Sequence, residues 1–121
     1  MSDALNILVV DDDTDAADSL AELFEMEGHH ALAVYSGDNA IAHCQQCGFD
    51  VAFMDIMMPG RNGVESFMEI KKMRPDAKVY MMTGFSVNEL VDQAVDNGAM
   101  GVFSKPVDLE RVFTVLEELA A

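Results

Sequence analysis

Short apolar runs alternate along the chain with segments whose apolar residues repeat at helical spacing. The runs carry mostly β-branched and large apolar side chains with little polar alternation; they are Ile7–Val10, Ala31–Tyr35, Val51–Met54, Val79–Met82 and Gly101–Phe103. Such runs are typical of parallel strands that are covered on both faces. The pattern therefore predicts five buried strands.

Each run is followed by a segment with an apolar stripe of helical period, which predicts five amphipathic helices. The stripes are Ala17, Leu20 and Phe24; Ala40, Ile41 and Cys44; Val64, Phe67 and Met68; Leu90, Val91, Ala94 and Val95; and Leu109, Val112, Phe113, Leu116 and Leu119. Asn62 and Glu65 have the spacing of a capping box, and Asp108 can cap the last helix. Glycines stand where three of the helices should end, at Gly28, Gly48 and Gly98.

Five strand–helix units in 121 residues predict an α/β fold, a doubly wound parallel sheet with helices on both faces. The length fits one domain, residues 1–121. The first six residues are polar and acidic, unlike a signal peptide, and the apolar runs are too short to span a bilayer. We therefore expect a cytoplasmic protein without a membrane partner.

The charge balance narrows the classes of partner. Seven Lys and Arg residues against 22 Asp and Glu give a formal net charge of −15. A chain this acidic repels phosphate backbones, so we expect no direct nucleic-acid binding. A cation is the more natural partner.

Chemically reactive side chains follow four of the five predicted strands. Asp11 and Asp12 follow the first strand, Asp55 the third, Thr83 the fourth and Lys105 the fifth. Ligands of doubly wound sheets bind at the carboxyl ends of the strands, so we expect these groups to lie together. Three carboxylates form an oxygen-rich pocket suited to Mg²⁺, and a lysine beside them suits a phosphoryl group. Asp55 ends the most apolar strand and is the predicted nucleophile.

Four motifs occur in a familiar order and spacing: "ILVVDDD", "VAFMDIMMPGRNG", "MMTG" and "VFSKPV". With them the chain resembles the receiver domains of two-component response regulators, over about residues 5 to 120. The resemblance implies a flavodoxin-like (βα)5 sheet of order 2-1-3-4-5. It implies that a phosphohistidine on a histidine kinase or histidine phosphotransfer protein phosphorylates Asp55. Self-phosphotransfer and slow autodephosphorylation are then the only reactions, so we expect no enzyme.

The resemblance also assigns a metal site. It implies that Asp12, Asp55 and the backbone carbonyl of Met57 bind Mg²⁺ directly, whereas Asp11 acts mainly through water. Asp13 is then left to help start the first helix, where negative charge is favourable.

The phosphoryl-contacting residues implied by the resemblance are Thr83 and Lys105, and the Lys105–Pro106 peptide is expected to be cis. Many receivers carry Tyr or Phe three residues before this lysine, and here that position is Val102. Phe103 reads as strand core. We therefore expect Thr83 to move on phosphorylation without a large swing of an aromatic ring.

The resemblance further implies an output surface made of the fourth helix, the fifth strand and the fifth helix. The expected partners there are a downstream effector protein, a fused output domain, or a second copy in a phosphorylation-dependent homodimer.

Two other site classes fit parts of the sequence. Asp11, Asp13, Asp15 and Glu22 match four positions of an EF-hand calcium loop, although Ala16 stands where glycine is required. A haloacid-dehalogenase-like phosphatase would instead use Asp11 as its nucleophile and Asp13 as its acid, but the later acidic pair that such enzymes need is missing.

The two cysteines form a C-x-x-C at Cys44 and Cys47. The pair closes a helical segment, whereas a redox pair favours a helix start, and no second ligand pair completes a zinc site. Cys44 is expected to pack on the apolar face of the helix.

Overall fold

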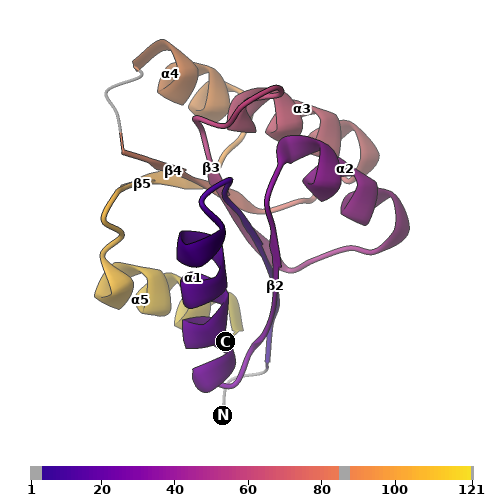
Figure 1. The fold of residues 1–121 in the computed structure, drawn as a ribbon. Helices are drawn as coiled ribbons and strands as arrows, with labels where there is room; N and C mark the ends of the chain where they lie inside the picture. Colours follow the sequence, from indigo (N-terminus) through magenta and orange to yellow (C-terminus); the bar gives the residue numbers. More distant parts are fainter. Residues whose placement is uncertain (1–3, 85–87, 121) are drawn as a thin grey trace.

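Strands and helices alternate along the chain in the computed structural model, which describes residues 4–84 and 88–120 (Figure 1). The strands are β1 (Asn6–Val10), β2 (His30–Val34), β3 (Val51–Asp55), β4 (Val79–Thr83) and β5 (Gly101–Ser104). The helices are α1 (Thr14–Met26), α2 (Gly37–Gln46), α3 (Gly63–Met73), α4 (Asn88–Asp96) and α5 (Leu109–Ala120).

The five strands form one parallel sheet in the order β2-β1-β3-β4-β5. Helices α1 and α5 cover one face of this sheet, and α2, α3 and α4 cover the other (Figure 1). The doubly wound, flavodoxin-like order expected from the sequence is confirmed. All five residues of the central strand β3 are buried, which explains the apolar run Val51–Met54 that precedes Asp55.

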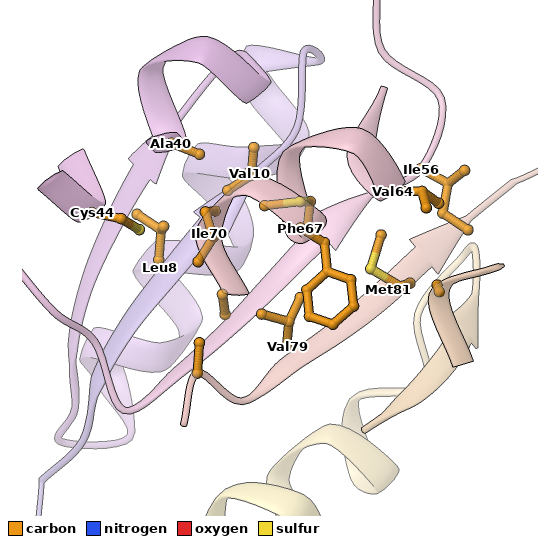
Figure 2. Packing of buried hydrophobic residues seen from close by; sticks show 14 of the residues in the cluster. Leu8, Val10, Ala40, Cys44, Ile56, Val64, Phe67, Ile70, Val79 and Met81 are labelled. Carbon is orange, nitrogen blue, oxygen red and sulfur yellow. The ribbon is translucent and has the colours of Figure 1, made fainter. Parts of the chain in front are cut away.

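The sheet separates two hydrophobic cores, because successive side chains of a strand point to opposite faces. Ile7 and Val9 pack with α1 and α5, whereas Leu8 and Val10 pack with α2 and α3. Figure 2 shows the second core, in which Phe67 and Ile70 of α3 project toward the strand residues beneath them. The two cores hold the sheet as a rigid platform for the residues that follow its strands.

Three strands are one residue longer at their carboxyl ends than the apolar runs predict. Asp55 pairs with Met82, and Thr83 pairs with Ser104, so polar residues join the ladder. The apolar pattern misses these positions because backbone hydrogen bonds, not hydrophobic side chains, hold them. Two of the predicted site residues, Asp55 and Thr83, are thereby fixed as the last residues of strands.

The predicted helix starts are confirmed. Asn62 and Glu65 form a reciprocal capping box at α3, the Asp13 carboxylate accepts from the backbone N–H of Ala16 at α1, and the Asp108 carboxylate accepts from that of Glu110 at α5.

The three predicted helix ends are confirmed, because α1, α2 and α4 each end two residues before the glycine that was expected to stop them. Gly28 and Gly98 end α1 and α4 with φ of 93° and 97°, which glycine adopts readily. Helix α2 ends at Gln46 with Cys47 in extended backbone, so Gly48 stands at the helix end without a positive φ.

The predicted apolar stripes are confirmed except at their borders, where Met68, Val95 and Leu109 are exposed. Cys44 is buried, as expected, and Cys47 is exposed; both are free thiols. Among residues 4–84 and 88–120, no helix has both the length and the apolar composition that crossing a bilayer requires.

Candidate functional site

Lys105 joins two carboxylates that come from different strands. Asp11 directly follows β1, Asp55 ends β3 and Lys105 directly follows β5. The Lys105 Nζ donates to Asp11 Oδ2 at 2.6 Å and to Asp55 Oδ2 at 3.0 Å. The sequence-predicted convergence at the carboxyl edge of the sheet is therefore present.

Local backbone hydrogen bonds fix the orientation of both carboxylates. Asp11 Oδ1 accepts from the N–H of Asp13 at 3.0 Å, and Asp55 Oδ1 accepts from the N–H of Met57 at 3.2 Å. The side chains of Asp11 and Asp55 are only 3% and 8% exposed. Each carboxylate is therefore held between a backbone amide and the Lys105 ammonium, with little freedom to reorient.

Asp12 completes a cluster of three carboxylates. One oxygen from each of Asp11, Asp12 and Asp55 lies within 4.8 Å of the others, and Asp12 is exposed to solvent. Over the described ranges, this is the one group of three or more His, Cys, Asp or Glu side chains that could hold a metal ion. A set of carboxylate oxygens with one solvent-facing member suits a hard divalent cation that keeps several waters.

Burial makes ionisation of Asp55 costly. Desolvation raises the pKa of Asp55 above its ordinary value, the hydrogen bond and charge of Lys105 oppose this, and the Asp11 charge adds to it. For Lys105, desolvation alone would lower the pKa, but the hydrogen bonds to Asp11 and Asp55 outweigh it and raise the pKa. Lys105 is thus a permanent cation, and it offsets only part of the repulsion within the cluster.

Thr83 lies at the same edge, one strand away from Asp55. It is buried, and its carbonyl oxygen accepts from the Lys105 N–H at 2.8 Å, which extends the β4–β5 ladder up to the lysine. The Lys105–Pro106 peptide is cis, as the resemblance implied. Val102 is partly buried and packs against the core on the face of the sheet that α4 covers. Phe103 is buried in the core on the opposite face, so the expectation that Phe103 is strand core is confirmed.

Gly63 is a site residue that the sequence pattern did not single out. A Cβ at this position would overlap the backbone carbonyl oxygen of Asp55 and crowd Ile56. The Gly63 N–H donates to the Ile56 carbonyl at 2.8 Å, so the start of α3 lies directly against the end of β3. A glycine directly after the Asn62 cap was the available signal, but only the tertiary contact shows why it is needed.

We expect Gly63→Ala to destabilise the fold by about 2 kcal/mol, because the new methyl group forces two backbone segments apart. Gly48→Ala is the matched control, since a Cβ there meets only the movable end of the Arg74 side chain. Urea unfolding of both variants measures the difference. Equal stability of the two variants would show that the α3–β3 contact is not tight.

The EF-hand alternative is wrong. Asp15 and Glu22 lie within α1 rather than in a loop around Asp11, and Asp11 is bonded to Lys105.

The geometry and the sequence together define a class of protein. Residues 7–117 match the family model described as the response regulator receiver domain. The chain belongs to this family.

Known relatives and solved structures agree with this assignment. Transcriptional regulatory protein ZraR of Salmonella typhimurium is 33% identical over 117 residues, which cover 97% of this chain and 26% of that protein. A CheY-like response regulator receiver domain protein from Methanospirillum hungatei superposes with a TM-score of 0.88 at 30% identity, covering 97% of both chains. A response regulator from Burkholderia pseudomallei, whose structure contains a phosphorylated aspartic acid, a calcium ion and citrate, has a TM-score of 0.85 at 26% identity, covering 98% of this chain and 69% of that one. The chain thus spans about a quarter of the length of the curated relative named here.

Proposed function

We propose that this receiver domain accepts a phosphoryl group on Asp55, from a phosphohistidine of a histidine kinase or histidine phosphotransfer protein, with Mg²⁺. The observation that carries the proposal is the Lys105 ammonium bonded to both Asp11 and Asp55, with Asp12 within reach of the same pocket. A phosphoryl group needs a nucleophile and several positive contacts, and these residues can supply both.

In the proposed transfer, an Asp55 carboxylate oxygen attacks phosphorus in line with the bond to the imidazole nitrogen. That P–N bond breaks, the electron pair leaves with the imidazole, and an acyl phosphate forms on Asp55. Lys105 is held at 3.0 Å from Asp55 and can follow the phosphoryl oxygens as their charge develops. Thr83, one strand away, can donate its hydroxyl to the same group.

The donor set fits Mg²⁺, because its oxygens are hard and one member faces solvent. Asp12, Asp55 and the backbone carbonyl of Met57 would hold the ion directly, with Asp11 acting through water. When bound, the ion would neutralise carboxylate repulsion and the charge on the incoming phosphoryl group. The calcium ion and phosphorylated aspartic acid of the Burkholderia relative support this assignment.

Phosphorylation would then act on α4, β5 and α5. A phosphoryl dianion draws Thr83 toward Asp55, and the segment that follows Thr83 leads directly to α4. The readout partner is an effector protein, a fused output domain or a second copy of the chain. Relatives such as ZraR, in which the matching segment is about a quarter of the protein, are consistent with a fused output domain.

Acetyl phosphate tests the reaction without the unknown kinase. We expect the chain to gain one phosphoryl group by intact mass in Mg²⁺, and none when EDTA removes divalent cations. Equal labelling in both conditions would contradict a metal-assisted transfer.

We expect Thr83→Ala to accept the phosphoryl group but to lose the response of α4 and β5. The measurement is the change in backbone amide NMR shifts of Asn88–Asp96 and Gly101–Ser104 on phosphorylation. Thr114→Ala on α5 is the control, because its hydroxyl bonds only locally, to the Glu110 carbonyl. If these NMR shifts change on phosphorylation of Thr83→Ala as much as they do in the wild type, Thr83 does not transmit the response to α4 and β5.

A further inference from the structure

Strand β2 forms the edge of the sheet on the side away from β5. Its residues are less buried than those of the other strands, and Leu32 on the strand is 46% exposed. Met26, at the end of the neighbouring helix α1, is 81% exposed. An edge strand with exposed apolar side chains is a natural template for another strand.

The backbone of β2 offers its outer side at Ala33. The His30 N–H donates to the Leu5 carbonyl and the Val34 carbonyl accepts from the Asp11 N–H, so even-numbered residues face β1. Odd-numbered residues therefore face outward. The Ala31 N–H is already bonded to a Glu25 carboxylate oxygen at 2.9 Å. Ala33 faces away from β1, the one strand that pairs with β2 in the described sheet, so its backbone groups are directed to the outer side.

A hollow lies on each side of this edge. The one beside α1 is about 610 Å³ and is lined by residues that include Ala21, Met26 and Ala33. The one beside α2 is about 380 Å³ and is lined by residues that include His43, Cys47 and Phe49. Ala31 and Leu32 border both hollows, and α1 and α2 lie on opposite faces of the sheet (Figure 1). Side chains of an added strand would alternate between the two hollows.

The two hollows differ in charge. The α1 side carries Asp18, Glu22 and Glu25, and the Tyr35 hydroxyl donates to Asp18 at 2.6 Å. Within the described ranges, none of the ion pairs involves these three carboxylates. The α2 side shares Glu25 but has no further carboxylate in its lining, which combines His30 and His43 with the apolar side chains of Leu32, Cys47 and Phe49. A strand that fits both hollows places cations on one face and apolar side chains on the other.

We propose that the outer edge of β2 is a docking site for an extended segment of a partner protein in which Lys or Arg alternates with apolar residues. The segment would pair with Ala33 and add a sixth strand to the sheet. A second copy of this chain fits poorly, because β2 itself (HALAV) carries no Lys or Arg and each copy has a net charge of −15.

The test uses a fluorescein-labelled synthetic peptide, SKVKVKS, and the 121-residue chain at low salt. We expect saturable binding by fluorescence anisotropy, weakening with added salt, and amide NMR shift changes centred on Ala33. Glu22→Gln should weaken binding roughly two- to fivefold, whereas Glu89→Gln on α4, an exposed carboxylate away from β2, should leave it unchanged. Ala33→Pro, which an edge strand tolerates at an outward-facing position, should weaken binding roughly tenfold or more by removing a backbone donor.

Circular dichroism verifies that Ala33→Pro is folded. If it is not, the peptide with N-methylated valines replaces that comparison, and it should bind as weakly. The proposal is overturned if SKVKVKS does not bind or if the acidic peptide SEVEVES binds equally well. It is also overturned if neither Ala33→Pro nor N-methylation of the peptide valines weakens binding, or if sedimentation shows that the free chain dimerises through β2. None of these outcomes depends on phosphorylation of Asp55.

Discussion

Asp55→Asn is expected to abolish uptake of the phosphoryl group from acetyl phosphate. The amide is nearly the same size as the carboxylate, and its single oxygen can keep one of the two bonds that Asp55 accepts, from the Met57 N–H at Oδ1 or from Lys105 at Oδ2. It is a far poorer nucleophile than a carboxylate and cannot form an acyl phosphate. Intact mass spectrometry in Mg²⁺ should show no modified species for this variant.

The control for this loss is Asp92→Asn, which makes the same chemical change at an exposed position of α4. It should be labelled at the wild-type rate. Labelling of Asp55→Asn at a comparable rate would place the acceptor on another residue.

Lys105→Met is expected to destabilise the metal-free fold by about 2 kcal/mol. Removing one partner of a buried ion pair typically lowers the free energy of unfolding by about 3–5 kcal/mol. The effect is expected to be smaller here, because the Lys105 side chain is 28% exposed to water. Methionine keeps the apolar stem, so the change isolates the ammonium. Without it, the buried Asp11 and Asp55 carboxylates face each other with no cation. Urea unfolding in EDTA measures the effect.

Lys72→Met provides a matched comparison, because Lys72 forms an ion pair with Glu69 at 3.0 Å on the exposed surface of α3. Such surface pairs contribute about 0–1 kcal/mol. Adding Asp55→Asn to Lys105→Met should recover part of the lost stability by removing one of the repelling charges. If the two lysine variants are equally stable, the Lys105 bridge is not what balances the carboxylates.

Much of the site could be predicted from the sequence, because its residues follow the carboxyl ends of parallel strands. Parallel strands end at a common edge, so identifying the strands was enough to bring Asp11, Asp55 and Lys105 together. The four motifs then supplied the strand order, which alternation of apolar and polar residues does not specify. The two bonds from one lysine to two carboxylates follow from that order.

The remaining features depend on contacts that no local pattern contains. Gly63 is required because α3 begins against the Asp55 carbonyl. Met68 and Val95 fit the helical period but remain 39% and 52% exposed, because the described neighbouring elements cover them only in part. Helix α2 ends without a positive φ at Gly48, because Cys47 already takes up extended backbone on the path to β3. The hollows beside β2 likewise arise from the placement of α1 and α2, not from the sequence of the strand.

The position of the phosphoryl group tests the central proposal most directly, because that proposal assigns acceptance of the group to Asp55 alone. Borohydride reduction of the labelled chain converts an acyl phosphate to an alcohol, which peptide mass spectrometry can locate. We expect conversion at Asp55, in the peptide that contains Met57 and Met58. Conversion at Asp11 would favour the phosphatase-like alternative, and a phosphoryl group on any residue other than Asp55 would rule out Asp55 as the sole acceptor.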